Sequence, residues 1–124
     1  MIRREVFAEL GGFDESLPAC EDYDLWLRLT ATRPVFLIDR PLIVKTGGHA
    51  DQLSRMPGLD RYRAAALRKI LDSGTLKPAQ EQAARAVLAE KARVYAEGCR
   101  KRGRDAEAEE YFQLAREEER ADAH

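Results

Sequence analysis

The second half of the chain is composed largely of residues that favour helices. From Leu59 onward Ala, Arg, Glu and Leu predominate, and there is no strand signal. Gly74 and Gly103 interrupt this pattern, and Pro78 stands where the first turn of a helix accepts proline. The pattern predicts a helical hairpin or small bundle, with helices over residues 59–73, 78–102 and 105–121.

The last two of these helices carry a regular spacing of small and aromatic residues. Gly103, Ala108, Phe112 and Ala115 are spaced like the packing positions of a tetratricopeptide repeat, which pairs two helices over about 34 residues. The same spacing suits any closely packed helix pair, so a generic Ala-rich hairpin is the alternative. A single repeat cannot bury its own face, and we therefore expect it to cap the domain or to pack on a partner.

The first half of the chain mixes helical and extended patterns. Residues 3–10 place apolar side chains on one helical face, and residues 21–31 form a second helical pattern with acids in its first turn. Two β-branched or aromatic runs, residues 35–38 and 42–44, then predict two short strands. We expect an α+β chain that is mainly α, with one short two-stranded element.

The charge balance is nearly even, since 21 Lys and Arg oppose 22 Asp and Glu, which gives a formal net charge of −1. Without a basic field or an aromatic-rich basic patch, nucleic acid is not an expected partner. No apolar run approaches the roughly 20 residues that cross a bilayer, and a signal peptide is not apparent, so we expect a cytoplasmic chain without a transmembrane segment. Cys20 and Cys99 are far apart and are expected to be free thiols.

Acidic residues gather at positions 21–24, just ahead of Trp26. The dipole of a helix favours acids in its first turn by about 0.3 to 1 kcal/mol each, which requires no chemistry. Asp24 and Arg28, four residues apart, are expected to form an ordinary surface pair. Asp22 shares a helical face with Trp26, and a carboxylate beside an aromatic ring suits a hydroxylated ligand, although such a Trp more often belongs to a core.

The segment RREVFAELGGFDESLPACEDYDLWLRL, residues 3–29, closely resembles the acceptor-side part of family 2 glycosyltransferases. In these inverting enzymes, which have the GT-A nucleotide-diphospho-sugar transferase fold, a GGFDE turn precedes an ED-x-DLWLRL helix. The resemblance continues to GGHADQLSR and covers residues 2–56. It implies that residues 1–56 are a C-terminal, acceptor-side piece of a GT-A α/β domain and that residues 57–124 are a helical extension.

The resemblance also implies roles for three residues at the start of the second helix. Asp22 matches the general base of the family, which takes a proton from the acceptor hydroxyl as that oxygen attacks the anomeric carbon of the donor. Glu21 is then expected to orient the site or bind the acceptor. Trp26 is expected either to stack on a sugar ring or to anchor the helix.

A Gly-rich polar loop follows the two predicted strands. Its His49 suits a group that closes over the donor pyrophosphate or its divalent metal, Mn²⁺ or Mg²⁺, although an exposed histidine without a role is the alternative. Asp51, Gln52 and Ser54 are weaker candidates in the same loop, and Asp51 or Ser54 could instead cap the next helix. We expect no metal to bind tightly to this chain, because the Asp-x-Asp motif of the family should follow a strand in an upstream half. Asp22-Tyr23-Asp24 lies within a helix instead.

Two functional interpretations follow from the missing donor half. In the first, the chain is part of a glycosyltransferase that uses a nucleotide-sugar donor and a hydroxyl acceptor, and the chain alone is inactive. In the second, it is a binding or scaffolding module whose helices associate with themselves or with a partner. Uncovered apolar side chains at Val6, Phe7, Leu37 and Val44 would favour the first interpretation, and they would also favour homo-oligomers.

Overall fold

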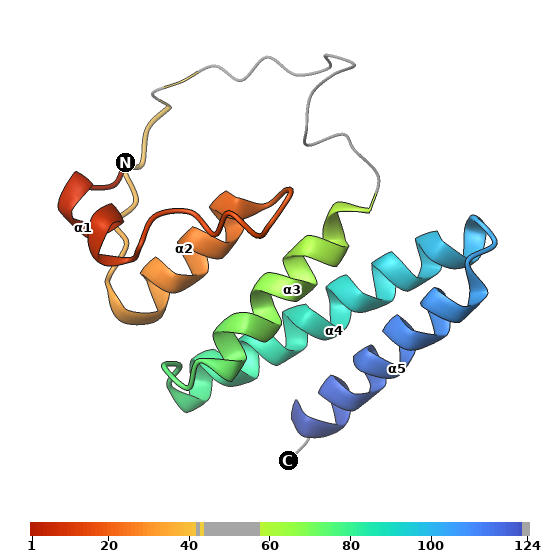
Figure 1. The fold of residues 1–124 in the computed structure, drawn as a ribbon. Coiled ribbons are helices and arrows are strands. Elements are labelled where there is room, and N and C mark those ends of the chain that lie inside the picture. The colour runs from red at the N-terminus through yellow and green to blue at the C-terminus, as the bar shows by residue number, and fades with distance from the viewer. Residues whose placement is uncertain (42, 44–57, 123–124) are drawn as a thin grey trace.

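The computed structural model describes residues 1–41, 43 and 58–122. Its described residues form five helices, which Figure 1 shows in order along the chain: α1 (Arg4–Glu9), α2 (Glu21–Thr32), α3 (Leu59–Asp72), α4 (Pro78–Lys101) and α5 (Asp105–Asp122). The three helices predicted for the second half are confirmed to within one residue at each end. None of the described helices is long and apolar enough to cross a membrane.

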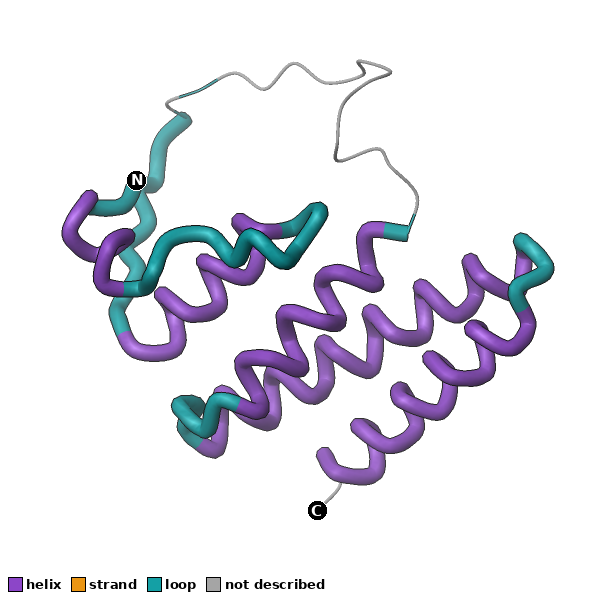
Figure 2. Tube along the Cα trace, viewed as in Figure 1, coloured by secondary structure: helices purple, strands orange, loops and turns teal. Residues whose placement is uncertain are grey.

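The predicted α+β fold with a two-stranded element is wrong. Figure 2 shows helices and loops but no strand in the described part of the chain. Residues 35–38 lie in a non-helical segment, and their side chains are 63% to 87% exposed. A strand needs a neighbour to pair its backbone groups, and β-propensity alone does not supply one. Of the second run, residues 42–44, only Ile43 is among the described residues.

The connection between α4 and α5 depends on Gly103. Its φ of +77° lies in the left-handed region, which glycine adopts without the steric cost of a Cβ atom. In this turn the Gly103 N–H donates to the carbonyl oxygen of Arg100 (3.1 Å), and the Arg104 N–H donates to that of Cys99 (2.9 Å). The tight turn sends α5 back along α4, as Figure 1 shows.

Small side chains allow α4 and α5 to pack closely. Ala92, Ala96 and Cys99 on α4 have no exposed surface, and Ala108 on α5 is nearly as buried. A second apolar cluster joins these helices to α3, with Leu67 of α3 at its centre. The helical hairpin therefore covers one side of α3, and both cysteines are confirmed as buried free thiols.

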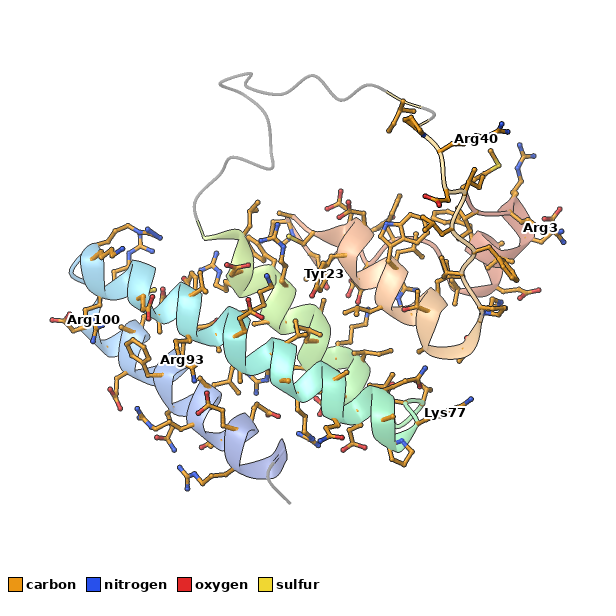
Figure 3. The ribbon with its side chains drawn as sticks, turned by 180° about the vertical axis from the view of Figure 1, so that it is seen from behind. Arg3, Tyr23, Arg40, Lys77, Arg93 and Arg100 are labelled. Atoms are coloured by element: carbon orange, nitrogen blue, oxygen red, sulfur yellow. The ribbon has the colours of Figure 1, made fainter. Side chains whose placement is uncertain are left out.

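The head of α2 is joined to the head of α3. Ala19 and Cys20, just before α2, pack against Leu59 at the start of α3. Tyr23 lies between the two helices and is labelled in Figure 3. At the other end of α2, the Gln80 side-chain amide of α4 donates to the carbonyl oxygen of Ala31 (3.3 Å). These contacts place the acidic first turn of α2 beside α3.

Candidate functional site

The acidic first turn begins at a residue with unusual backbone geometry. Cys20, which precedes α2, has a left-handed conformation with φ of +60°, the one positive φ at a described residue other than glycine. Such a conformation is costly for a residue with a Cβ atom and persists where the surroundings hold it. The Cys20 thiol donates to the carbonyl oxygen of Leu59 (3.7 Å), and burial raises the pKa of this thiol. The start of α2 is thus tied to the start of α3.

Asp22 lies at the second position of α2 with its side chain exposed to solvent. Its Oδ1 accepts a hydrogen bond from the backbone N–H of Tyr23 (2.8 Å). Within the described residues no cation forms a salt bridge with Asp22, and the neighbouring Glu21 is half-buried. A carboxylate in this position keeps one oxygen open to an incoming group.

Asp24, two residues later, is in the opposite situation: its predicted pair with Arg28 is confirmed, but the expectation that this pair lies on the surface is wrong. The residue is 1% exposed. Arg28 does form the predicted ion pair (3.0 Å), but Lys69 of α3 adds a second one (3.1 Å) that the local spacing did not indicate. Asp24 is therefore a buried anchor of the fold. Because cations occupy both of its oxygens, it is poorly placed to form a metal pair with Asp22.

The same ion cluster holds the GGFDE turn. Asp14 accepts hydrogen bonds from the Ser16 hydroxyl (2.6 Å) and from the Lys69 ammonium (2.9 Å), and these bonds lower the pKa of Asp14. Arg28 donates to the carbonyl oxygens of Leu10 and Gly12, the latter at 2.7 Å. The turn, α2 and α3 thus share a single charged cluster.

Sequence reasoning missed Lys69 and the structural role of Asp14. Asp14 belongs to the recognised GGFDE turn, so the motif itself could have indicated that Asp14 has a role in the structure. Lys69 is 55 residues away from Asp14 in a different helix, and no local spacing connects the two residues. Only the packing of α3 against α2 brings the Lys69 ammonium to these carboxylates.

Trp26 lies one turn after Asp22 and is 42% exposed, whereas its neighbour Leu25 is 2% exposed and belongs to the core. Trp26 lines an open hollow of about 840 Å³ between the N-terminal residues and the segment that follows α2. Leu29 and Phe36 are also part of its wall. An exposed aromatic ring on an apolar hollow can contact a ligand or another protein surface.

The predicted loop residues His49, Asp51, Gln52 and Ser54 lie outside the described residues. Within the described residues no three His, Cys, Asp or Glu side chains are arranged to hold a metal ion. Among these residues, Asp22 therefore belongs to no such group.

Comparison with known proteins places the chain among glycosyltransferases. The model of the family described as glycosyltransferase like family 2 matches residues 1–70, more than half of the chain, and the chain belongs to this family. The matched region contains α1, α2 and all but the end of α3.

Individual relatives match between 55 and 71 residues of the chain. An uncharacterized glycosyltransferase of Rickettsia felis is 34% identical over 55 residues, which is 44% of this chain and 9% of that protein. The O-antigen biosynthesis protein RfbC of Myxococcus xanthus is 37% identical over 71 residues, 56% of this chain and 6% of that protein. The chain thus spans less than a tenth of the length of these curated relatives. No solved structure matches it significantly.

Proposed function

We propose that this chain supplies the acceptor side of a family 2 glycosyltransferase with a GT-A domain, and that Asp22 is its general base. In the complete enzyme the Asp22 carboxylate takes the proton of the acceptor hydroxyl as that oxygen attacks the anomeric carbon of a nucleotide-sugar donor. The bond from the anomeric carbon to the diphosphate oxygen breaks, and the nucleoside diphosphate leaves with inversion. Glu21 and Trp26 contact the acceptor in this proposal.

The different environments of the motif acids carry the proposal. Asp24 is buried and neutralised by Arg28 and Lys69, so it cannot receive a proton from a substrate without disrupting the fold. Asp22 is exposed at a helix start, where the dipole favours negative charge. Of these two carboxylates, Asp22 is therefore the one available to a hydroxyl from solvent.

Exposed apolar side chains favour a glycosyltransferase part over an independent module. Leu37 is 87% exposed and Phe36 is 85% exposed, whereas Val6 and Phe7 are half-buried. Val44 lies outside the described residues. A module that functions alone gains nothing from such a run, while a larger domain can cover it. The donor site and its Mn²⁺ or Mg²⁺ would then belong to that larger domain, and His49 is a candidate contact to them. The cytoplasmic location stays a prediction.

Sugar-nucleotide turnover tests this function. The purified chain is expected to release no nucleoside diphosphate from a panel of UDP-, GDP- and dTDP-sugars. In a longer protein that includes the donor half, Asp22→Asn is expected to lower kcat at least about a hundredfold, since general-base catalysis contributes about 10² to 10⁴. Glu15→Gln, which alters an exposed acid of the neighbouring turn, serves as the control. Turnover by the chain alone that Asp22→Ala abolishes would overturn the expected inactivity, and full activity of Asp22→Asn would overturn the role of Asp22.

A further inference from the structure

Lys69 connects two segments that are distant in the sequence. Its Nζ lies 2.9 Å from Oδ2 of Asp14 in the GGFDE turn, and 3.1 and 3.2 Å from the two carboxylate oxygens of Asp24 in α2. Burial disfavours the charge of this ammonium, yet the hydrogen bonds to Asp14 and Asp24 raise the pKa of Lys69 above its usual value. The charged form is therefore the form that joins the turn, α2 and α3.

Lys69 lies in the last turn of α3, whereas the contacts between the start of α2 and the start of α3 are mostly apolar. Ala19, Cys20 and Tyr23 pack against Leu59, and such contacts have little directional preference. An ion pair with a buried carboxylate is directional, because the carboxylate is fixed on α2 and the loss of one of its two cations, Lys69 or Arg28, leaves the buried Asp24 charge less well compensated. Lys69 therefore restricts how the first turn of α2 is oriented on α3.

We propose that Lys69 is a positioning residue of the candidate site: by bridging Asp14 and Asp24, it holds the first turn of α2 in the orientation that presents the Asp22 carboxylate. Asp22 is two residues from Asp24 on the same helical turn, so any rotation that releases Asp24 also moves Asp22. The importance of this orientation for catalysis rests on the proposed function, but the orientation itself does not.

The two cysteines provide a local test with an internal reference. Cys20 is 8% exposed at the start of α2, whereas Cys99 is completely buried between α4 and α5. The rate at which a thiol reagent labels each cysteine can be followed by mass spectrometry of the whole chain and its peptides. Lys69→Met is expected to raise the labelling rate of Cys20 about tenfold and to leave that of Cys99 unchanged, because only the α2 head is released. Equal acceleration at both cysteines would indicate global unfolding and would overturn local positioning.

Two further variants separate charge from side-chain volume. Lys69→Arg, which keeps a cation that can bridge two carboxylates, is expected to restore slow labelling of Cys20 to within about twofold. Lys101→Met makes the same substitution in the last turn of α4, at a lysine that is not one of the cations paired with Asp14 or Asp24, and is expected to change neither rate. Unchanged labelling of Cys20 in Lys69→Met would refute the proposal.

The labelling ratio does not depend on sugar transfer, so the positioning proposal and the proposed function can fail separately. In a longer, active protein, Lys69→Met is expected to lower kcat about tenfold with little change in the KM for the donor. If Asp22→Asn retains activity, the proposed function is wrong whatever the labelling shows. If Asp22→Asn is inactive while Lys69→Met keeps full kcat, the positioning role is wrong.

Discussion

Asp22 and Asp24 are two residues apart and have opposite environments. Asp22 is exposed and accepts a single backbone hydrogen bond, whereas Asp24 is 1% exposed and pairs with two cations. Helical geometry explains the difference, because positions two residues apart point to different sides of the helix. One side of the first turn therefore anchors α2 to α3, and the other is exposed to solvent.

Removing the charge of Asp24 is expected to destabilise the chain far more than removing that of Asp22. Asp24→Asn leaves Arg28 and Lys69 without their shared anion, and because both cations are partly hydrated we expect a loss of about 2 to 3 kcal/mol. Asp22→Asn removes only a helix-dipole interaction and is expected to cost less than about 1 kcal/mol. Urea unfolding followed by circular dichroism measures both, and equal losses would contradict the assigned environments.

Acid is expected to weaken the cluster around Asp14. Hydrogen bonds from Ser16 and Lys69 hold the pKa of Asp14 well below its ordinary value of 3.8. As the pH falls, the unfolded chain binds a proton at Asp14 before the folded chain does. The stability from this group is therefore present above the ordinary value and lost below it. The free energy of unfolding should fall between about pH 5 and about pH 2.

The contribution of Asp14 can be isolated with Asp14→Asn. This variant is expected to be less stable than the original chain near neutral pH and to lose less stability on acidification, because its side chain no longer titrates. Urea titrations at several pH values provide the comparison. An acid dependence that is identical in the two proteins would show that other carboxylates are responsible.

The α4–α5 hairpin is built on small residues along one face of each helix. Ala92 and Ala96 of α4 are completely buried, and Ala115 of α5 is 2% exposed. The ring of Tyr95 meets that of Tyr111 edge-on, with ring centroids 4.6 Å apart. The side-chain hydroxyl of Tyr95 donates to Glu107 across the hairpin (2.5 Å). Close packing and this polar contact together fix the register of α5 on α4.

Enlarging a small residue in this seam is expected to disrupt the hairpin. Ala96→Leu adds three carbon atoms at a completely buried position, and we expect the free energy of unfolding to fall by about 1 to 3 kcal/mol because of overpacking. Ala86→Leu makes the same change at an exposed position of α4 and should alter stability by less than about 0.5 kcal/mol. Thermal unfolding of both variants tests the helix pairing, and full stability of Ala96→Leu would contradict it.

Considered as a whole, the molecule has a well-packed helical part and an apolar surface near its N-terminus. Phe36 and Leu37 are the most exposed members of the run at residues 35–38, and Trp26 and Val35 line the neighbouring hollow. Contiguous apolar surface of several hundred Å² usually marks a site of association. We therefore expect this surface to be covered when the chain is part of a larger domain, and to promote self-association when the chain is alone.

The isolated chain is accordingly expected to self-associate through residues 35–38. Phe36→Lys should weaken the association strongly, because it places a charge in the contact, and should change monomer stability by less than about 0.5 kcal/mol. Sedimentation velocity over a range of concentrations measures the association. Val94→Lys, at a half-exposed position of α4, serves as the control. A wild-type chain that stays monomeric at high concentration would refute this prediction.

The predictions that succeeded from sequence depend on interactions between near neighbours. Gly103 ends α4 and Pro78 begins it because each acts on its own backbone, so the helix limits could be placed closely. The GGFDE turn and the ED-x-DLWLRL helix also form a continuous pattern, which was sufficient to recognise the glycosyltransferase family. By contrast, the predicted strands failed because a strand depends on a distant partner, and none accompanies residues 35–38 among the described residues.

The sequence by itself thus determined the helices, their turns and the family. Only the tertiary structure decided which motif acids are free and which are anchors. Asp24 and Arg28 form the local pair that their spacing predicts, but burial and Lys69 turn that pair into the centre of a cluster. The burial of Asp24 and its pairing with Lys69, 45 residues away in the sequence, result from the packing of α2 against α3. No local sequence pattern contains that information.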